Sequence, residues 1–211
     1  IVEDDRLALE KFKKGELDLY FISRAQWWQE EFNLEDENFD YLYRGLIQKK
    51  KIFNYRWKGI SGLAFNMRRE PFNDKRIRQA FSLLWNRDLL IDKLFFTEYY
   101  PLKSYFPGGV YENGSNPEIT YNPEKAVELL TAAGWSTRNK EGWLVKDGKR
   151  FDIEMGIRQD LERIFTPYQE DLAKVGIKLN LKYVTSQTMF KNVMNERNFD
   201  LTYQGWTGLM I

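Results

Sequence analysis

Apolar and polar positions in the first half of the chain predict a strand followed by two helices. The apolar run that ends at Phe65 is typical of a buried strand, and Pro71 cannot continue a strand ladder. Apolar residues then recur at helical spacing, and Asp74 can cap the free N–H groups at the start of this second element. We therefore expect one helix over residues 74–85 and another over residues 87–96.

From Tyr121 onward, the pattern alternates between helical and extended segments. Pro123 suits the first position of a helix that ends at Gly134, and Asp147-Gly148 favours the tight turn of a hairpin. The expected elements are a helix at 123–134, a hairpin at 143–155, a helix at 160–176, a strand at 177–184, a short helix at 186–196 and a strand at 199–206. This interleaving predicts an α/β fold with a mixed sheet flanked by helices.

The first sixty residues give a weaker pattern. We expect a helix over residues 3–14 and a strand over the alternating run 17–22, with short helices near 25–32 and 36–47. Residues 99–122 are rich in Pro, Gly and Asn and predict a long loop. The predicted organisation is an N-terminal segment, 1–60, that leads into a lobe formed by 61–211.

Composition excludes some functions and leaves others open. The 32 basic and 31 acidic side chains balance, so charge gives no case for a nucleic-acid partner. No apolar stretch approaches the roughly 20 residues that span a bilayer. Aromatic residues make up 16% of the chain, which fits either a bulky core or a surface that stacks on peptide or sugar.

The chain contains no Cys and no His. Disulfides, thiol nucleophiles and His-based triads are therefore excluded within it, and nothing in the sequence indicates a metal or another cofactor. A hydrolase that uses only carboxylates stays possible, although no pair of acidic residues is placed distinctively. Because the chain starts at Ile1 without Met and stops in an apolar run at Ile211, we expect it to be a piece of a longer polypeptide.

One segment resembles a known family signature. FNMRREPFNDKRIRQAF, residues 65–81, is similar to the pattern FN-x-R-x-x-PF-x-D-x-R-[IV]-R-QA of the periplasmic peptide-binding proteins of ABC importers, extracellular solute-binding protein family 5. Four further segments resemble the same family in the same order, and the likeness is greatest to the YejA-like oligopeptide receptors. They are LEKFKKGELDLYFI, RDLLIDKLFF, NPEKAVELLTAAGW and FDLTYQGWTG.

The resemblance implies a two-lobed fold that closes around its ligand like a Venus flytrap. This chain would supply the second lobe, and the first lobe of the same polypeptide would be its missing partner. The implied function is binding without catalysis: a peptide or peptide-like ligand is delivered to an ABC permease. The implied location is the periplasm, or a lipid anchor outside the cytoplasmic membrane.

The resemblance also implies a ligand pocket on the last strand and the turn after it. Exposed backbone groups there can pair with a peptide whatever its side chains are, and Trp206 can form a wall or can simply pack in the core. Many relatives carry an acidic residue three positions after this Trp, where the present chain has Leu209, so the anchor for a ligand ammonium is not assigned. The implied residues are Tyr203, Gln204, Gly205, Trp206, Thr207 and Gly208.

Weaker candidates lie elsewhere in the chain. Tyr105 and Phe106 belong to the loop that faces the cleft in relatives, but a plain surface loop is the alternative. Arg68 and Arg69 can bind a ligand carboxylate, or can pair with Glu70, Asp74 or a neighbouring lobe.

Two other functions remain open at this point. A carboxylate-dependent glycan hydrolase would use Trp and Tyr to stack on sugars. A protein-interaction domain would use the aromatic surface to bind a partner.

Overall fold

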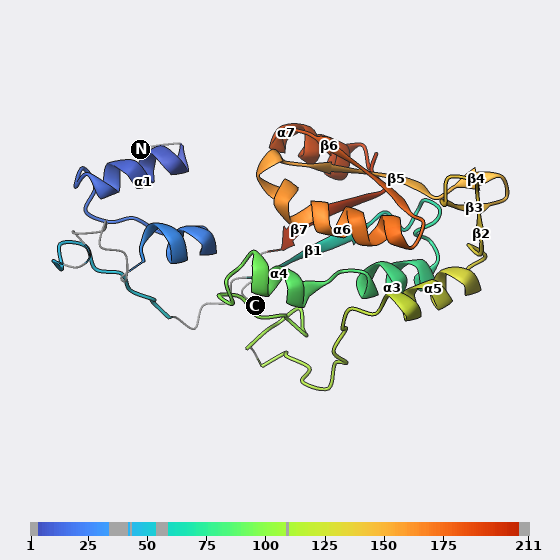
Figure 1. The fold of residues 1–211 in the computed structure, drawn as a ribbon, viewed down its shortest axis with the longest axis horizontal. Coiled ribbons are helices and arrows are strands. Elements are labelled where there is room, and N and C mark those ends of the chain that lie inside the picture. The colour runs from blue at the N-terminus through green and yellow to red at the C-terminus, as the bar shows by residue number, and fades with distance from the viewer. Residues whose placement is uncertain (1–3, 34–41, 43, 54–58, 109, 207–211) are drawn as a thin grey trace. The chain divides into compact units, whose positions relative to one another are not determined.

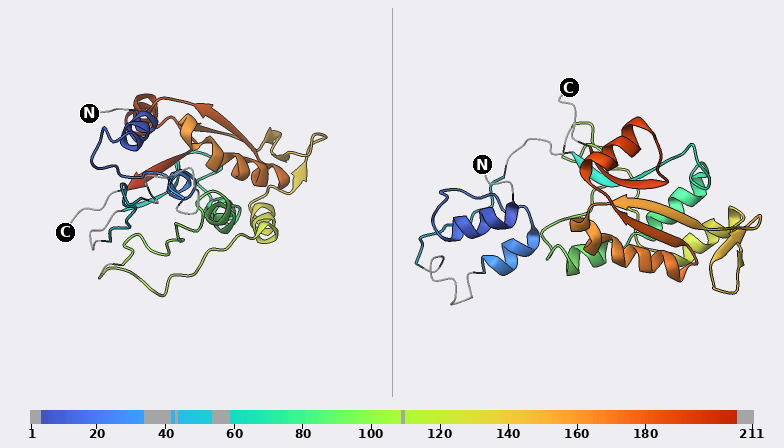
Figure 2. Two further views of the ribbon diagram at one scale, coloured as in Figure 1. Left: turned by 60° about the vertical axis from the view of Figure 1, so that its left-hand side comes forward. Right: turned by 90° about the horizontal axis from the view of Figure 1, so that it is seen from above.

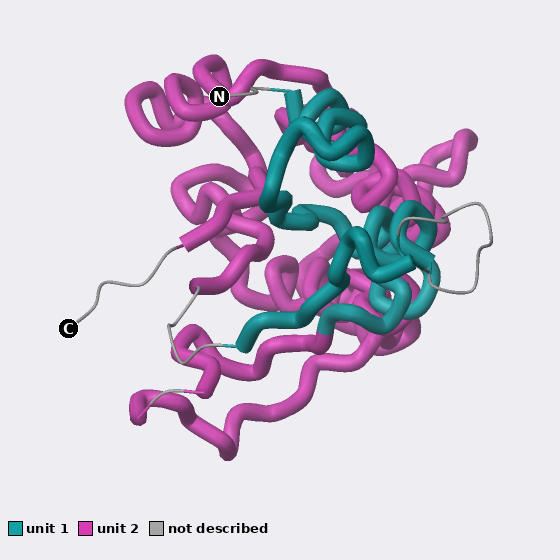
Figure 3. The backbone as a smooth tube through the Cα atoms, turned by 90° about the vertical axis from the view of Figure 1, so that its left-hand side faces the viewer, with its two compact units in different colours: residues 1–53, 91–99 teal, residues 54–90, 100–211 magenta. Residues whose placement is uncertain are grey.

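The computed structural model describes residues 4–33, 42, 44–53, 59–108 and 110–206. The chain divides into two compact units, shown in different colours in Figure 3. Unit 1 comprises residues 1–53 and 91–99, and unit 2 comprises residues 54–90 and 100–211. The predicted division into residues 1–60 and 61–211 concerns the lobes of a complete receptor and stays a prediction.

Unit 1 contains a small core of its own. Helix α1, Asp5–Lys13, starts where the Asp4 side chain accepts a hydrogen bond from the Leu7 N–H at 2.7 Å. A π-helix follows at Trp27–Glu31, in the segment predicted as a short helix. The buried side chains of this core are Leu9, Trp27, Phe32 and Leu42.

The strand predicted over residues 17–22 is wrong, because the described structure has no strand there. The alternation that suggested it is present: Tyr20 and Ile22 pack against the core of unit 1, while Leu19 and Phe21 are 68% and 76% exposed. A strand also needs a hydrogen-bonded neighbour, and the described residues of unit 1 contain no strand that could pair with this segment. Most of the helix predicted at 36–47 lies outside the described residues.

Unit 2 is built on a mixed four-stranded sheet in the order β1-β7-β5-β6 (Figure 1). Its strands are β1 Ile60–Phe65, β5 Asp152–Ile157, β6 Lys178–Tyr183 and β7 Leu201–Trp206. β7 is antiparallel to β1, whereas β5 is parallel to both β6 and β7. The predicted α/β fold with a mixed sheet is confirmed.

Helices follow the predicted order after β1, and the last residues of one of them, 91–93 of α4, belong to unit 1. Their bounds are α3 Lys75–Leu83, α4 Arg87–Lys93, α5 Pro123–Ala132, a 3₁₀ turn Gln159–Leu161, α6 Glu162–Lys174, α7 Ser186–Phe190 and a π-helix Lys191–Asn195. The predicted caps are present: Asp74 accepts from the Arg76 N–H at 2.8 Å, and Asn122 accepts from the Lys125 N–H at 2.9 Å. The described part of the 99–122 loop contains neither helix nor strand.

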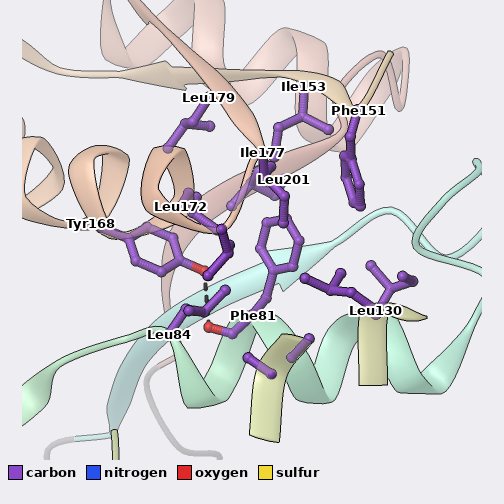
Figure 4. Close-up of a cluster of buried hydrophobic side chains, with 14 of the residues drawn as sticks. Phe81, Leu84, Leu130, Phe151, Ile153, Tyr168, Leu172, Ile177, Leu179 and Leu201 are labelled. Atoms are coloured by element: carbon purple, nitrogen blue, oxygen red, sulfur yellow. Dashed lines mark hydrogen bonds between the residues drawn. The ribbon is translucent and has the colours of Figure 1, made fainter. Parts of the chain in front are cut away.

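The core of unit 2 lies between one face of the sheet and helices α3, α5 and α6. Leu201 and Ile153 point from the sheet toward Phe81 on α3 and Leu172 on α6 (Figure 4). Tyr168 is also buried there, and its hydroxyl donates to the Phe81 carbonyl at 3.0 Å. Because alternate residues of a strand point to opposite faces, this core fixes which side chains of β7 point away from it.

A small three-stranded sheet lies beside α5 at one end of unit 2 (Figures 1 and 2). It consists of β2 Thr137–Arg138, β3 Leu144–Lys146 and β4 Lys149–Arg150. The predicted turn is correct, with Asp147 and Gly148 at φ 51° and 74°. The hairpin predicted to reach residue 155 is too long, since β5 leaves it to pair with β6 in the main sheet. Among the described residues, no helix combines the length and apolarity needed to cross a membrane.

Substituting Phe81→Ala should lower the free energy of unfolding by about 3–5 kcal/mol, because this fully buried ring would leave a cavity between α3 and the sheet. Met67→Ala is the control, since that side chain is 60% exposed. Urea denaturation of both variants tests the assignment of the core. Equal, small effects in the two variants would contradict it.

Substituting Asp74→Asn should keep the helix cap but remove the ion pair with Arg76, whose guanidinium lies 2.6 Å from the carboxylate. This hydrogen bond lowers the pKa of Asp74. The stabilisation is therefore complete above the unfolded pKa of about 3.9 and disappears as the pH falls through the folded value. Thermal unfolding should show the wild type slightly more stable at pH 7, by at most about 1 kcal/mol, and equal to the variant near pH 2.

Candidate ligand-binding site

β7 is paired along its whole length on one side only. Its register with β1 runs from Leu201 opposite Phe65 to Trp206 opposite Ile60. On the other side, β5 pairs with β7 only through Met155 and Leu201. The second half of β7 therefore has an edge that β5 does not cover.

The backbone groups on this edge can be assigned from the pairing. The Asn66 N–H donates to the Asp200 carbonyl at 2.9 Å, so the backbone of Asp200 faces β1. The backbone groups of successive residues in a strand point alternately to its two edges. The N–H and C=O groups of Thr202, Gln204 and Trp206 therefore also face β1. Tyr203 and Gly205 consequently direct their N–H and C=O groups to the uncovered edge.

A pocket of about 300 Å³ lies against this edge. Its lining comes from the segments that follow the parallel strands β5 and β6, together with the end of β7. Carboxyl ends of parallel strands meet at one edge of a sheet, where α/β proteins commonly bind ligands. The lining residues are Arg158, Leu161, Ser186, Met189, Phe190, Met194, Tyr203, Gln204 and Gly205.

This lining is mostly apolar and carries one cationic side chain. Arg158 directs its Nε and Nη2 to the two carboxylate oxygens of Asp160, at 3.0 and 2.8 Å. That hydrogen bonding raises the pKa of Arg158 and fixes the plane of its guanidinium group. Phe190 and Met194 are 60% and 61% exposed, so a ligand in the pocket can contact both.

The structure brings together three of the residues predicted for the site, namely Tyr203, Gln204 and Gly205. The ring of Tyr203 also packs edge-on against Phe165, with centroids 5.5 Å apart, so part of this side chain belongs to the core. Gln204 donates from Nε2 to the Thr202 hydroxyl at 3.3 Å.

Trp206 lies at the end of β7 with 44% of its surface exposed, and it belongs to neither core cluster. Tyr105 is 72% exposed and does not line this pocket. The predicted residues Thr207 and Gly208 lie outside the described residues, as does Leu209.

The signature segment contacts the turn before β7 and not the pocket. The side-chain amide of Asn66 donates to the carbonyls of Arg197 and Phe199, at 3.1 and 2.9 Å. Arg69 donates to Asn198 at 2.9 Å and lies 3.5 Å from the Asp200 carboxylate. The latter partner differs from the Glu70 and Asp74 considered from the sequence.

Sequence reasoning missed the part of the lining contributed by the segments that follow β5 and β6. Arg158 directly follows β5, and Ser186 comes three residues after β6. The sequence did not predict that these strands are parallel; with that pairing known, the rule that carboxyl ends of parallel strands converge points to both residues. Met189 and Met194 have no such signal, because their contribution depends on how α7 and the following π-helix lie against the sheet.

Comparison with known proteins identifies relatives of the whole chain. The model of the bacterial extracellular solute-binding proteins, family 5 Middle, matches residues 1–211. The oligopeptide-binding protein AppA of Bacillus subtilis is 29% identical over 157 residues, which cover 69% of this chain and 28% of AppA. The uncharacterized protein YejA of Escherichia coli is 24% identical over 242 residues, covering 98% of this chain and 39% of YejA.

Solved structures with a similar fold include that of one of these relatives. AppA of Bacillus subtilis in complex with a nonapeptide superposes with a TM-score of 0.70 at 22% identity, covering 98% of this chain and 40% of AppA. The chain thus spans well under half the length of these relatives.

Substituting Trp206→Ala should lower the free energy of unfolding by less than about 1 kcal/mol, because the indole is half exposed and outside the core. Tyr203→Ala should cost about 2 kcal/mol, because it removes the contact with Phe165. Urea denaturation of the two variants compares them directly. If Trp206→Ala lowered the free energy of unfolding more than Tyr203→Ala does, the Trp206 side chain would have to pack in the core.

Proposed function

This chain belongs to the bacterial extracellular solute-binding proteins, family 5, and on that premise we propose that it binds a peptide along the uncovered edge of β7. The proposal covers an oligopeptide or a peptide-like compound, taken up by an ABC importer. The single observation that carries it is the one-sided pairing of β7 beside an open pocket.

Backbone pairing explains how such a site accepts peptides of different sequence. Tyr203 and Gly205 offer two N–H donors and two carbonyl acceptors to an added strand. At about 0.5–1.5 kcal/mol for each hydrogen bond, this edge contributes roughly 2–6 kcal/mol. Micromolar affinity needs about 8 kcal/mol, so backbone pairing alone is insufficient.

The pocket supplies further affinity through side chains. Met189, Phe190 and Met194 form an adaptable apolar surface, since unbranched Met side chains repack around different groups. Burying one Leu or Phe side chain of a ligand there adds about 1.5–3 kcal/mol. Arg158 offers a ligand carboxylate the guanidinium N–H groups that its pair with Asp160 does not use. This fits the absence of an acidic side chain at position 209.

The remaining affinity would come from a second lobe that closes over the peptide. In that scheme the ligand stabilises the closed form, which docks on a membrane permease outside the cytoplasm. The name of the relative AppA and its complex with a nonapeptide support a peptide as the ligand. Within this scheme Trp206 forms a wall beside the ligand, and Tyr105, Thr207 and Gly208 remain predicted contacts.

Substituting Gly205→Pro in the complete gene product tests the proposal, because proline removes the N–H that faces the uncovered edge. The loss of one hydrogen bond, with a ligand carbonyl left unpaired, should raise the Kd for bound peptides about tenfold. Isothermal calorimetry with a peptide library selected on the wild type measures the change.

Gly205→Ala is the matched control. It keeps the N–H, and its added Cβ would lie 3.5 Å from the Ser61 hydroxyl, an ordinary contact distance. Its Kd should stay within about twofold of the wild type. Absence of binding to any peptide by the wild type would refute the peptide assignment, and equal effects of the two substitutions would refute the role of the edge.

A further inference from the structure

We propose that Asn66 is the positioning residue of the binding strand and that Arg69 assists it. The expected effect on peptide affinity rests on the proposed function, whereas the role of Asn66 in placing β7 does not depend on it. Both residues lie in the turn after β1, and both contact the four residues that lead into β7.

Asn66 is almost fully enclosed, and both of its side-chain N–H donors are used. Its side chain, 7% exposed, directs both amide hydrogens to carbonyls of the turn before β7, and its Oδ1 accepts from the Arg68 N–H at 3.3 Å. Its own N–H donates to the Asp200 carbonyl at 2.9 Å. Both the backbone and the side chain of Asn66 therefore bind the segment that starts β7, which few residue types can do.

The turn before β7, residues 197–200, has a backbone conformation that depends on hydrogen bonds from other residues. Arg197, whose carbonyl accepts from Asn66, has a φ of 53°, in the left-handed region that residues with a Cβ rarely adopt. Asn198 next to it donates its N–H to the Asn192 carbonyl at 2.7 Å and accepts from Arg69. Without these bonds, the turn has other conformations available, and β7 would start from a different point.

Asp200 links the same turn to β5. Its carboxylate accepts from the Glu154 N–H at 3.1 Å and lies 3.5 Å from Arg69. This side chain thus stands next to the single backbone pair between β5 and β7. A shift of Asp200 would change how far β7 diverges from β5. It would therefore change the space available to an added strand beside Tyr203 and Gly205.

An edge binds an added strand well only if its backbone N–H and C=O groups are correctly oriented. Hydrogen bonds weaken steeply once the donor angle falls below about 120°, so a small rotation of β7 lowers affinity without unfolding the sheet. We therefore expect Asn66 to act on the ligand through β7, with no contact to the ligand itself.

The test uses Asn66→Asp and Arg69→Ala in the complete gene product, with Arg68→Ala as the matched control. Asn66→Asp removes both donors and places a carboxylate against two carbonyl oxygens. Arg68→Ala removes the same charge as Arg69→Ala from the same exposed turn, but spares the contacts to Asn198 and Asp200. If Asn66→Asp fails to fold, the Arg69 variants decide the question.

Amide hydrogen exchange is the first measurement. Thr202 and Gln204, whose N–H groups face β1, should exchange at least tenfold faster in Asn66→Asp and several-fold faster in Arg69→Ala. Asn180 and Lys182 in β6, whose N–H groups face β5, should keep their wild-type rates. Equal acceleration of all four amides would show a general loss of stability and overturn the proposal.

Peptide affinity is the second measurement. The Kd should rise about tenfold in Asn66→Asp and about threefold in Arg69→Ala, with recovery in Arg69→Lys, which keeps a cation near Asp200. Values equal to those of Arg68→Ala would overturn the proposal. If the wild type binds no peptide, the proposed function fails, and the exchange rates still decide whether Asn66 positions β7.

Discussion

The one-sided pairing of β7 is the constraint on which the candidate site depends. β1 holds β7 along its whole length, while β5 meets it at Met155 and Leu201 alone. An interior strand normally has both edges bonded, since an unpaired backbone group away from water is costly. Here the second edge opens on a pocket at the carboxyl ends of the parallel strands, where water or a ligand can satisfy it. Side-chain alternation along the same strand directs Tyr203 toward the core and Trp206 to the opposite face, where it is exposed.

This constraint changes the meaning of the signature segment. From the sequence, the signature is a strand end, a proline turn and a helix start, and the structure confirms the cap at Asp74. Its first polar residue, Asn66, does something that the pattern did not indicate, because it binds the turn before β7, over 130 residues away in the chain. The signature therefore lies away from the candidate pocket but is bonded to the turn that leads into the strand bordering it.

Local chemistry explains why most of the fold was predictable. Caps such as Asn122, the Asp147-Gly148 turn and the period of each apolar face specify an element within a few residues. The strand at 17–22 failed because pairing is a property of two segments, and alternation in one of them cannot supply the other. The Met-lined wall of the pocket was equally hidden, since it depends on how α7 packs and not on any local signal. The site residues on β7 were expected from a family resemblance, and no local pattern assigns them.

The most direct test of the account is the amide signal of Tyr203 and Gly205 during a peptide titration of the complete gene product. An added strand would bond these two amides and slow their hydrogen exchange by at least tenfold, while Gln204, already facing β1, would change little. This is the result that the one-sided pairing predicts. Slower exchange at Gln204 with unchanged Tyr203 and Gly205, in a protein saturated with peptide, would contradict it.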